Sequence, residues 1–241
     1  MTHRSRPPWR PCRASTANTS NPHVLTPLGG TPPAPKVAEA ASTVRSAVRG
    51  AGKSGSAVVT GLGDGVDELV AKSPTLQSDL QRLQQNRWTI KYGPEGSGST
   101  ADRRNKIIQI DGTERGDPAA ATQSLAHEIG HASYEYKPDY SSRSAYIDSA
   151  MADEGAATMS NIRAQREIVA NDGTDIGIAG NSANHAAYNG AYDQFLQDGD
   201  MAAARQAIGA KFGAGEVTSN TGQSYADYYG GWYDKAFPAR K

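Results

Sequence analysis

Cysteine is almost absent from this 241-residue chain, whose only cysteine is Cys12. No disulfide can therefore form within one chain, and a zinc site built from several thiolates is excluded. Any metal ion must be held by nitrogen and oxygen ligands, which are histidine and carboxylate side chains. The five histidines and the acidic residues are accordingly the candidate ligands.

Long apolar runs are also missing. No segment approaches the roughly 18 apolar residues that a membrane-spanning helix requires, so we expect no membrane span. The first residues, Met-Thr-His-Arg-Ser-Arg-Pro-Pro, are basic but are not followed by the apolar stretch of a cleavable secretory signal. We therefore expect a protein that is secreted without such a signal or that is otherwise cytoplasmic.

The chain has no net charge, but its charges are unevenly distributed. Residues 1–53 carry eight basic side chains and one acidic side chain, whereas the rest of the chain is mildly acidic. Eight of the 13 prolines lie in residues 1–36, where apolar residues are too sparse to offset the entropy of ordering. We interpret residues 1–52 as a disordered basic leader rich in Pro, Ser and Thr, with a short helix over 37–50. Because its charges are dispersed, we expect no nucleic-acid partner.

Residues 60–241 are predicted to form one folded domain that is mainly helical. Two β-forming segments, 87–92 and 106–110, are separated by a Gly/Ser loop and predict a small antiparallel ribbon ahead of the first long helix. The expected fold class is therefore α+β. Apolar spacing and capping signals predict helices over residues 74–85, 118–136, 143–170, 183–197, 200–212 and 222–236.

The motif HEIGH, from His127 to His131, lies inside the predicted helix over 118–136. Histidines four residues apart lie about 40° apart around a helix, so both imidazoles can reach one metal ion. Zinc binds imidazole nitrogen and keeps an open position in catalytic sites. Glu128 lies about 100° from His127 around the helix, where it can accept a proton from an attacking water without binding the metal. The motif therefore predicts a zinc site in which Glu128 is the general base.

The same helix also carries an apolar face. Asp117, followed by a proline, supplies an N-cap and defines where the helix begins. The residues that lie opposite the histidines are Leu125, Ile129, Ala132 and Tyr136. The spacing predicts a helix with one side packed on a core and the histidine side facing a cleft.

A third protein ligand is required, and Glu154 is the candidate. It lies 23 residues after His131 in the next predicted helix, within the run Met-Ala-Asp-Glu-Gly-Ala-Ala. The small neighbours let that helix approach the metal helix closely, and a glutamate among them is unusual for simple packing. Either Asp153 or Asp148 could accept a hydrogen bond from a ligand imidazole and orient its ring.

The motif HEIGH followed by a helix-borne glutamate resembles the gluzincin branch of zinc metallopeptidases. The resemblance covers about residues 87–161 and includes a β-rich segment ahead of the metal helix. It implies a zincin-like fold, hydrolysis of peptide bonds, and an edge strand that binds extended peptide by strand addition. Many gluzincins carry an aspartate four residues after this glutamate, whereas this chain has Thr158.

Asp175 is a second candidate for the third ligand. Aspzincins take this ligand from an aspartate in a Gly-Thr-x-Asp stretch, and residues 172–176 read Asp-Gly-Thr-Asp-Ile. Here the aspartate follows the threonine directly, and the Tyr-Gly typical of that group is missing. Glu154 is therefore the preferred ligand.

Hydrolysis at zinc usually requires a further hydrogen-bond donor for the developing oxyanion. His185 is the only other histidine after residue 60, and it is the candidate for this catalytic role. A group of tyrosines within residues 225–233 supplies further phenols, although their spacing is equally that of a helix packed on a core.

A basic leader, a metallopeptidase-like domain and no cleavable signal together resemble effector and toxin proteins of bacterial specialised secretion systems, including the type VI kind. This resemblance implies a protein or peptide substrate and a secretion-apparatus, chaperone or immunity-protein partner. The alternative is a non-catalytic interaction protein in which a metal ion joins two helices. The sequence does not distinguish ordinary peptides from the peptide cross-links of a cell wall.

Overall fold

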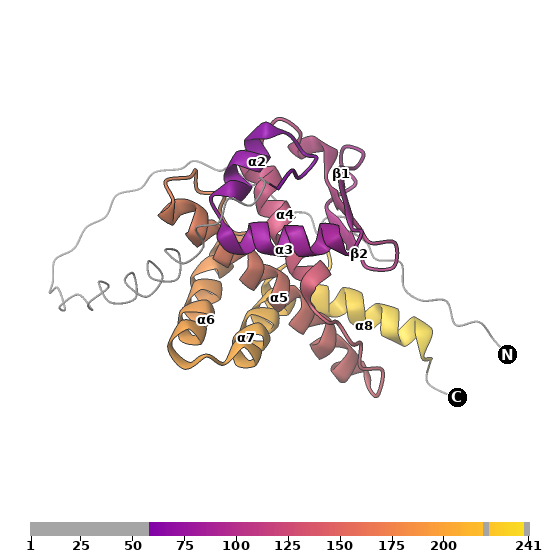
Figure 1. Cartoon of the computed structure of the whole chain (residues 1–241). Coiled ribbons are helices and arrows are strands. Elements are labelled where there is room, and N and C mark those ends of the chain that lie inside the picture. The colour runs from indigo at the N-terminus through magenta and orange to yellow at the C-terminus, as the bar shows by residue number, and fades with distance from the viewer. Residues whose placement is uncertain (1–57, 219–221, 239–241) are drawn as a thin grey trace, which may run out of the picture. The chain divides into compact units, whose positions relative to one another are not determined.

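The computed structural model describes residues 58–218 and 222–238, so the leader over 1–52 and the helix expected within it lie outside the described residues. The described part is mainly helical with one small sheet, which confirms the α+β fold class (Figure 1). The elements in chain order are α2 (Asp64–Ala71), α3 (Pro74–Gln85), β1 (Thr89–Tyr92), β2 (Thr100–Asp102), β3 (Ile107–Ile110), the 3-10 helix η1 (Gly112–Glu114), α4 (Pro118–Ser133), α5 (Arg143–Ala170), the 3-10 helix η2 (Ser182–Asn184), α6 (His185–Asp198), α7 (Met201–Gly215) and α8 (Tyr225–Ala236).

Side-chain caps define where the main helices begin. The Asp117 carboxylate accepts a hydrogen bond from a first-turn N–H of α4, as predicted. Ser73 and Ser142 cap α3 and α5 in the same way. The predicted helices over 74–85 and 143–170 are confirmed with the same bounds, and the three that follow them are confirmed with ends shifted by a few residues.

Two features of the helices differ from the prediction. α4 ends at Ser133 and not near Tyr136, because Tyr134 takes an extended conformation that cannot continue the helix. α2 was not predicted, because it begins among closely spaced glycines, which usually indicate a flexible linker and not the start of a helix. One of them, Gly63, occupies its N-cap with a φ of 113°, a conformation that favours glycine.

The sheet is mixed, so the predicted antiparallel ribbon is wrong. β1 and β3, which lie within the two predicted segments, pair in parallel, with Thr89 opposite Ile107 and Tyr92 opposite Ile110. β2 was not predicted, and it pairs antiparallel with the other side of β3, giving the order β1-β3-β2. The connection between β1 and β3 contains β2, which runs in the opposite direction to both strands. The chain therefore comes back to the starting end of β1 before β3 begins, and β1 and β3 run in the same direction.

Asp111 anchors the loop after β1 at the end of β3. Its buried carboxylate accepts hydrogen bonds from the N–H groups of Gly96, Gly98 and Thr113. Burial acts to raise the pKa of Asp111, but the bonds from these donors hold it well below its usual range. The carboxylate therefore stays charged and ties the loop down shortly before α4 begins.

Two apolar clusters form the core, and α5 contributes to both. The first cluster joins α2, α3, α4 and β3 and includes Leu80 and Leu125, both fully buried. The second joins α5 to α6, α7 and α8 and includes Tyr188 and Ile208. In Figure 1, α6 and α7 lie on the side of α5 away from α2 and α3. The region between the clusters is where α4 meets α5.

α4 and α5 approach each other closely at Gly130. A β-carbon at this position would lie 2.5 Å from the Cα of Ala157 and 2.8 Å from the Cβ of Ser160, so only glycine fits without displacement of α5. The expectation that small residues around Glu154 allow a close approach is therefore confirmed. The contact brings the helix with the HEIGH motif against the helix that carries the candidate third ligand.

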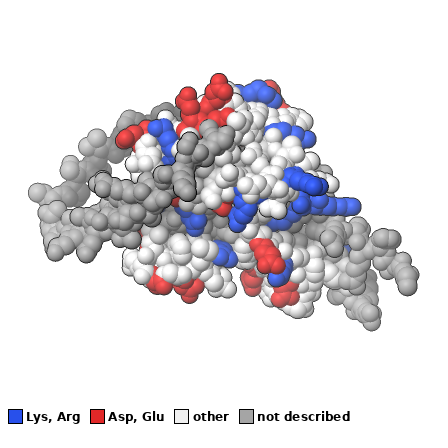
Figure 2. Space-filling model, in the orientation of Figure 1, with Lys and Arg blue, Asp and Glu red and all other residues white. Residues whose placement is uncertain are grey.

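None of the described helices combines the length and the apolar character needed to cross a membrane. The face drawn in Figure 2 carries charges of both signs, with acidic side chains at the end where α2 lies and basic side chains toward the sheet. The described part of this face therefore presents no continuous surface of one sign. That the protein lacks a nucleic-acid partner stays a prediction.

Gly130 and Gly190 provide a matched test of the helix contact, because both lie inside helices but only Gly130 is crowded. We expect Gly130→Ala to lower the free energy of unfolding by about 1–3 kcal/mol, since the overpacking outweighs the better helix propensity of alanine. Gly190 has no heavy atom within 4 Å of a β-carbon placed on it, so Gly190→Ala should raise stability by about 0.5–1 kcal/mol. Urea unfolding measures both changes, and a stabilising Gly130→Ala would contradict the close contact.

Candidate metal centre

The structure brings together the side chains of His127, His131 and Glu154. One potential ligand atom from each lies within 4.8 Å of the others, and all three residues are buried. The Oε2 atom of Glu154 lies 3.6 Å from Nε2 of His127 and 3.5 Å from Nε2 of His131. Two imidazoles and a carboxylate therefore point at a common position, as the sequence predicted.

Local helix geometry positions the two histidines, whereas helix packing positions the glutamate. His127 and His131 are one turn apart on α4, and their ring centroids lie 4.9 Å apart with the ring planes at 80°. Glu154 comes from α5, where its neighbour Gly155 packs against the backbone of Arg205 on α7. A side chain larger than glycine there would push α5 away from α7.

Burial controls the charges of the ligand group. It lowers the pKa of His127, so this imidazole is neutral and able to bind a cation through nitrogen. Neither ring nitrogen of His127 has a hydrogen-bond partner among the described residues, which is costly for a buried polar group. Burial acts to raise the pKa of Glu154, but the two histidines hold it well below its usual range, so the carboxylate is ionised.

The residues present fit a divalent metal ion. Two imidazoles and one carboxylate match the three protein ligands of catalytic zinc sites such as His₂Glu centres. The same donor set also suits iron(II), whose sites use two histidines and one carboxylate. A bound cation would satisfy the buried Nε2 of His127, which faces Glu154, and would neutralise the charge of Glu154. The geometry thus supports a metal site, and the choice of zinc belongs to the proposal below.

Asp153 lies behind the ligands, next to His131. Its Oδ1 atom is 3.2 Å from Nδ1 of His131, which places the carboxylate where it can orient the ring and fix its tautomer. Of the two residues considered for this role, Asp148 is exposed on α5, so the geometry selects Asp153.

Arg103 is a site residue that sequence reasoning missed. It follows β2 and donates hydrogen bonds to the Asp153 carboxylate and to the backbone carbonyl of His131. Its guanidinium also lies over the ring of Tyr136. An arginine in a turn 24 residues before the motif carries no local signal of this contact, which exists only because the sheet packs beside α4.

Glu128 lies beside the ligand group and is 2% exposed. Burial raises its pKa to about 8, with the charge of Glu154 adding to the rise and that of His131 opposing it. Glu128 is not one of the three converging residues, in line with the prediction that it flanks the metal without binding it. Its perturbed pKa is typical of a group that gains and loses a proton near neutral pH.

The histidine side of α4 was expected to face a cleft, but it is covered. His127 and His131 are only 3% and 7% exposed, and the ring of Phe212 on α7 stacks on His127 with centroids 6.4 Å apart. The reason is that α7 and α8 pack on α5 through the second apolar cluster and so close over the ligands. This covering could not be read from the pattern of one helix.

Tyr229 of α8 contacts the ligand group, whereas His185 does not. The Tyr229 hydroxyl donates a hydrogen bond of 3.3 Å to Oε1 of Glu154. His185 lies at the start of α6, near the ring of Tyr188, and none of its described contacts reaches the three converging residues. The catalytic role of His185 therefore stays a prediction. The tyrosine group at 225–233 was noted from the sequence, but its spacing did not single out Tyr229.

Asp175, the alternative third ligand, lies away from this group. It is exposed and accepts hydrogen bonds from the Gln165 side chain and the Gly177 N–H. The structure therefore selects Glu154 over Asp175.

Metal binding should depend on the three converging residues. We expect one zinc ion per chain, measured by elemental analysis after dialysis, with chelation lowering the unfolding temperature. His127→Ala, His131→Ala and Glu154→Ala should each lose most of the bound metal, because three protein ligands become two. His185→Ala is the matched histidine control and should keep it. Full metal content in Glu154→Ala would show that the site is assembled differently.

Comparisons with protein-family models, with curated proteins and with solved structures find no match for this chain. The functional evidence in this chain is therefore the ligand group, its burial and its neighbouring carboxylates.

Proposed function

We propose that this protein is a zinc-dependent metallopeptidase of the gluzincin kind. The observation that carries the proposal is the buried convergence of His127, His131 and Glu154, with Glu128 adjacent and outside the ligand set. A metal ion needs only three protein ligands in a catalytic site, which leaves a position for water or substrate. The resemblance of the HEIGH motif to gluzincins supports the same reaction.

When bound, zinc supplies Lewis acidity that makes water a nucleophile at neutral pH. The remaining chemistry falls to the side chains of this chain. Glu128 takes the proton of the attacking water and then transfers it to the leaving amine. A cation that neutralised the nearby charge of Glu154 would lower the pKa of Glu128 from about 8, so its carboxylate would be available as a base. Asp153 and Arg103 hold the His131 ring in place.

A second candidate function is a non-catalytic interaction protein in which the metal joins α4 to α5. The burial of the ligands favours this alternative, because substrate must reach a metal for hydrolysis. Structural zinc sites, however, are closed by a fourth protein ligand, and the described residues that converge here number three. The ligand count therefore favours catalysis, with movement of a covering element to admit substrate.

The biological setting belongs to the same proposal. We infer that the enzyme acts as a secreted bacterial effector or toxin that cleaves proteins, peptides or the peptide cross-links of a cell wall. A secretion apparatus, a chaperone or an immunity protein would then be its partner. This inference rests on the resemblance in sequence organisation described above, and not on the metal centre.

Glu128→Gln tests whether the site is catalytic. We expect the zinc-loaded variant to lose about 10²–10⁴-fold in the rate of casein or peptide hydrolysis, because glutamine cannot accept the proton. Its zinc content should match that of the wild type. Glu135→Gln, at an exposed position just beyond α4, is the matched control and should leave the rate unchanged. Equal hydrolysis by zinc-loaded Glu128→Gln would rule out the base assignment, and a wild type without hydrolysis would favour the interaction protein.

Tyr229→Phe and His185→Ala separate two candidates for the donor that stabilises the oxyanion. We expect Tyr229→Phe to lower kcat by at least about tenfold with little change in KM, because its hydroxyl lies beside Glu154. His185→Ala should leave kcat unchanged, since none of its described contacts reaches the ligand group. A large loss of kcat in His185→Ala alone would instead support the role predicted from the sequence.

A further inference from the structure

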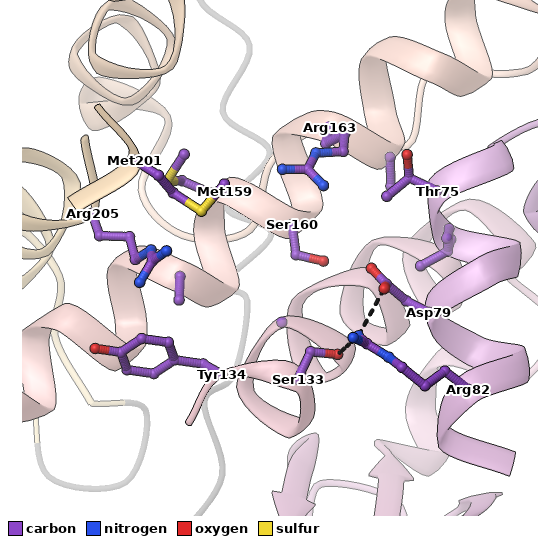
Figure 3. Close-up of a pocket in the computed structure, with 14 residues that line it drawn as sticks. Thr75, Asp79, Arg82, Ser133, Tyr134, Met159, Ser160, Arg163, Met201 and Arg205 are labelled. Carbon is purple, nitrogen blue, oxygen red and sulfur yellow. Dashed lines mark hydrogen bonds and ion pairs between the residues drawn. The ribbon is translucent and has the colours of Figure 1, made fainter. Parts of the chain in front are cut away.

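A pocket of about 220 Å³ lies on the face of α5 opposite the metal centre (Figure 3). Arg163 lies nine residues after Glu154, which corresponds to about 180° around the helix. α3, α4 and α7 complete the walls through residues that include Arg82, Ser133 and Arg205, and none of the three candidate ligands lines the pocket. This is therefore a separate site that the proposed reaction does not use.

Positive charge dominates the pocket lining. It contains three arginines, Arg82, Arg163 and Arg205, and a single acidic residue, Asp79. Figure 3 shows Arg205 on one side of the pocket and Arg163 above it, with Asp79 and Arg82 together on the α3 wall. The charged side chains of the lining thus carry a net charge of +2.

Among the described residues, Arg82 is the one of these three arginines that hydrogen-bonds a carboxylate. Its Nη2 atom donates hydrogen bonds to Asp79 at 2.8 Å and to the Ser133 hydroxyl at 3.1 Å. Arg163 makes no hydrogen bond or ion pair with any described residue. The Arg205 guanidinium carbon lies 5.2 Å from the centroid of the Tyr134 ring, and this group makes no hydrogen bond or ion pair with a described residue. Two half-buried guanidinium groups therefore lie in one pocket with no described carboxylate bound to them.

Nearby acidic groups reduce the positive charge, but among the described residues they do not hydrogen-bond Arg163 or Arg205. Burial raises the pKa of Asp79, and the charges of Arg82 and Arg163 oppose the rise, so Asp79 is shared between two arginines. Glu167 lies next to the pocket, but its carboxylate already accepts hydrogen bonds from the hydroxyl groups of Ser73 and Thr75. Arg163 and Arg205 are thus left with hydrogen-bond donors that a ligand can use.

We propose that this pocket binds the phosphate group of a small phosphate-bearing molecule. Guanidinium groups donate paired hydrogen bonds that match phosphate oxygens, and a phosphate dianion balances a charge of +2. The Ser133 and Ser160 hydroxyls in the lining are further donors. The apolar wall formed by Met159 and Met201 accommodates the carbon part of a monoester.

Calorimetric titration of the full chain with inorganic phosphate and with phenyl phosphate, at pH 8 and constant ionic strength, tests this proposal. We expect saturable binding of one phosphate group per chain with a Kd of about 1 mM or tighter. Arg163→Met/Arg205→Met should weaken it at least about tenfold. Arg104→Met removes an exposed arginine outside the pocket and should not change the Kd. The wild type and the variants are titrated with the same metal content, so phosphate bound at the metal contributes equally to each and does not change the difference between them.

The relative affinities of phenyl phosphate and inorganic phosphate identify the source of the phosphate group. Tighter binding of phenyl phosphate indicates an organic monoester, whereas equal binding indicates free phosphate. Arg163→Lys keeps the charge but loses the paired donors, so it should weaken binding even if the double variant does not fold. No binding at about 10 mM, or binding that the Arg163 and Arg205 variants leave unchanged, would overturn the proposal. Neither result depends on peptidase activity.

Discussion

The contact between α4 and α5 at Gly130 is the constraint on which the metal centre depends. Because no side chain separates the helices there, Glu154 reaches the two histidines directly. Each added carbon between the helices would move the carboxylate away from the imidazoles, and a metal site tolerates little displacement of its ligands. The packing of Gly155 on α7 applies the same constraint from the other side of α5.

The electrostatic balance of the centre follows from this packing. Three carboxylates, those of Glu128, Asp153 and Glu154, are buried near two histidines. Asp153 is paired with Arg103, and Glu128 holds a proton near neutral pH, so Glu154 carries the charge that a cation would neutralise. A buried ionised carboxylate beside two imidazole nitrogens supplies the donors that a divalent ion would use.

The two faces of α5 serve different chemistry. One face presents Glu154 to the metal motif, and the other presents Arg163 to the basic pocket. Both sites use α4 and α7 as further walls, since Phe212 covers His127 while Arg205 enters the pocket. A ligand in the pocket would therefore bind the same helices whose spacing sets the metal geometry.

The sequence alone determined what depends on short spacing. The histidine pair, the adjacent Glu128 and the capped start of α4 follow from the period of a helix, and the small residues around Glu154 indicated which helix would approach. Tertiary structure decided the rest, because contacts between distant segments leave no local pattern. It paired β1 with β3 in parallel, brought Arg103 and Tyr229 to the ligands, and closed α7 over His127.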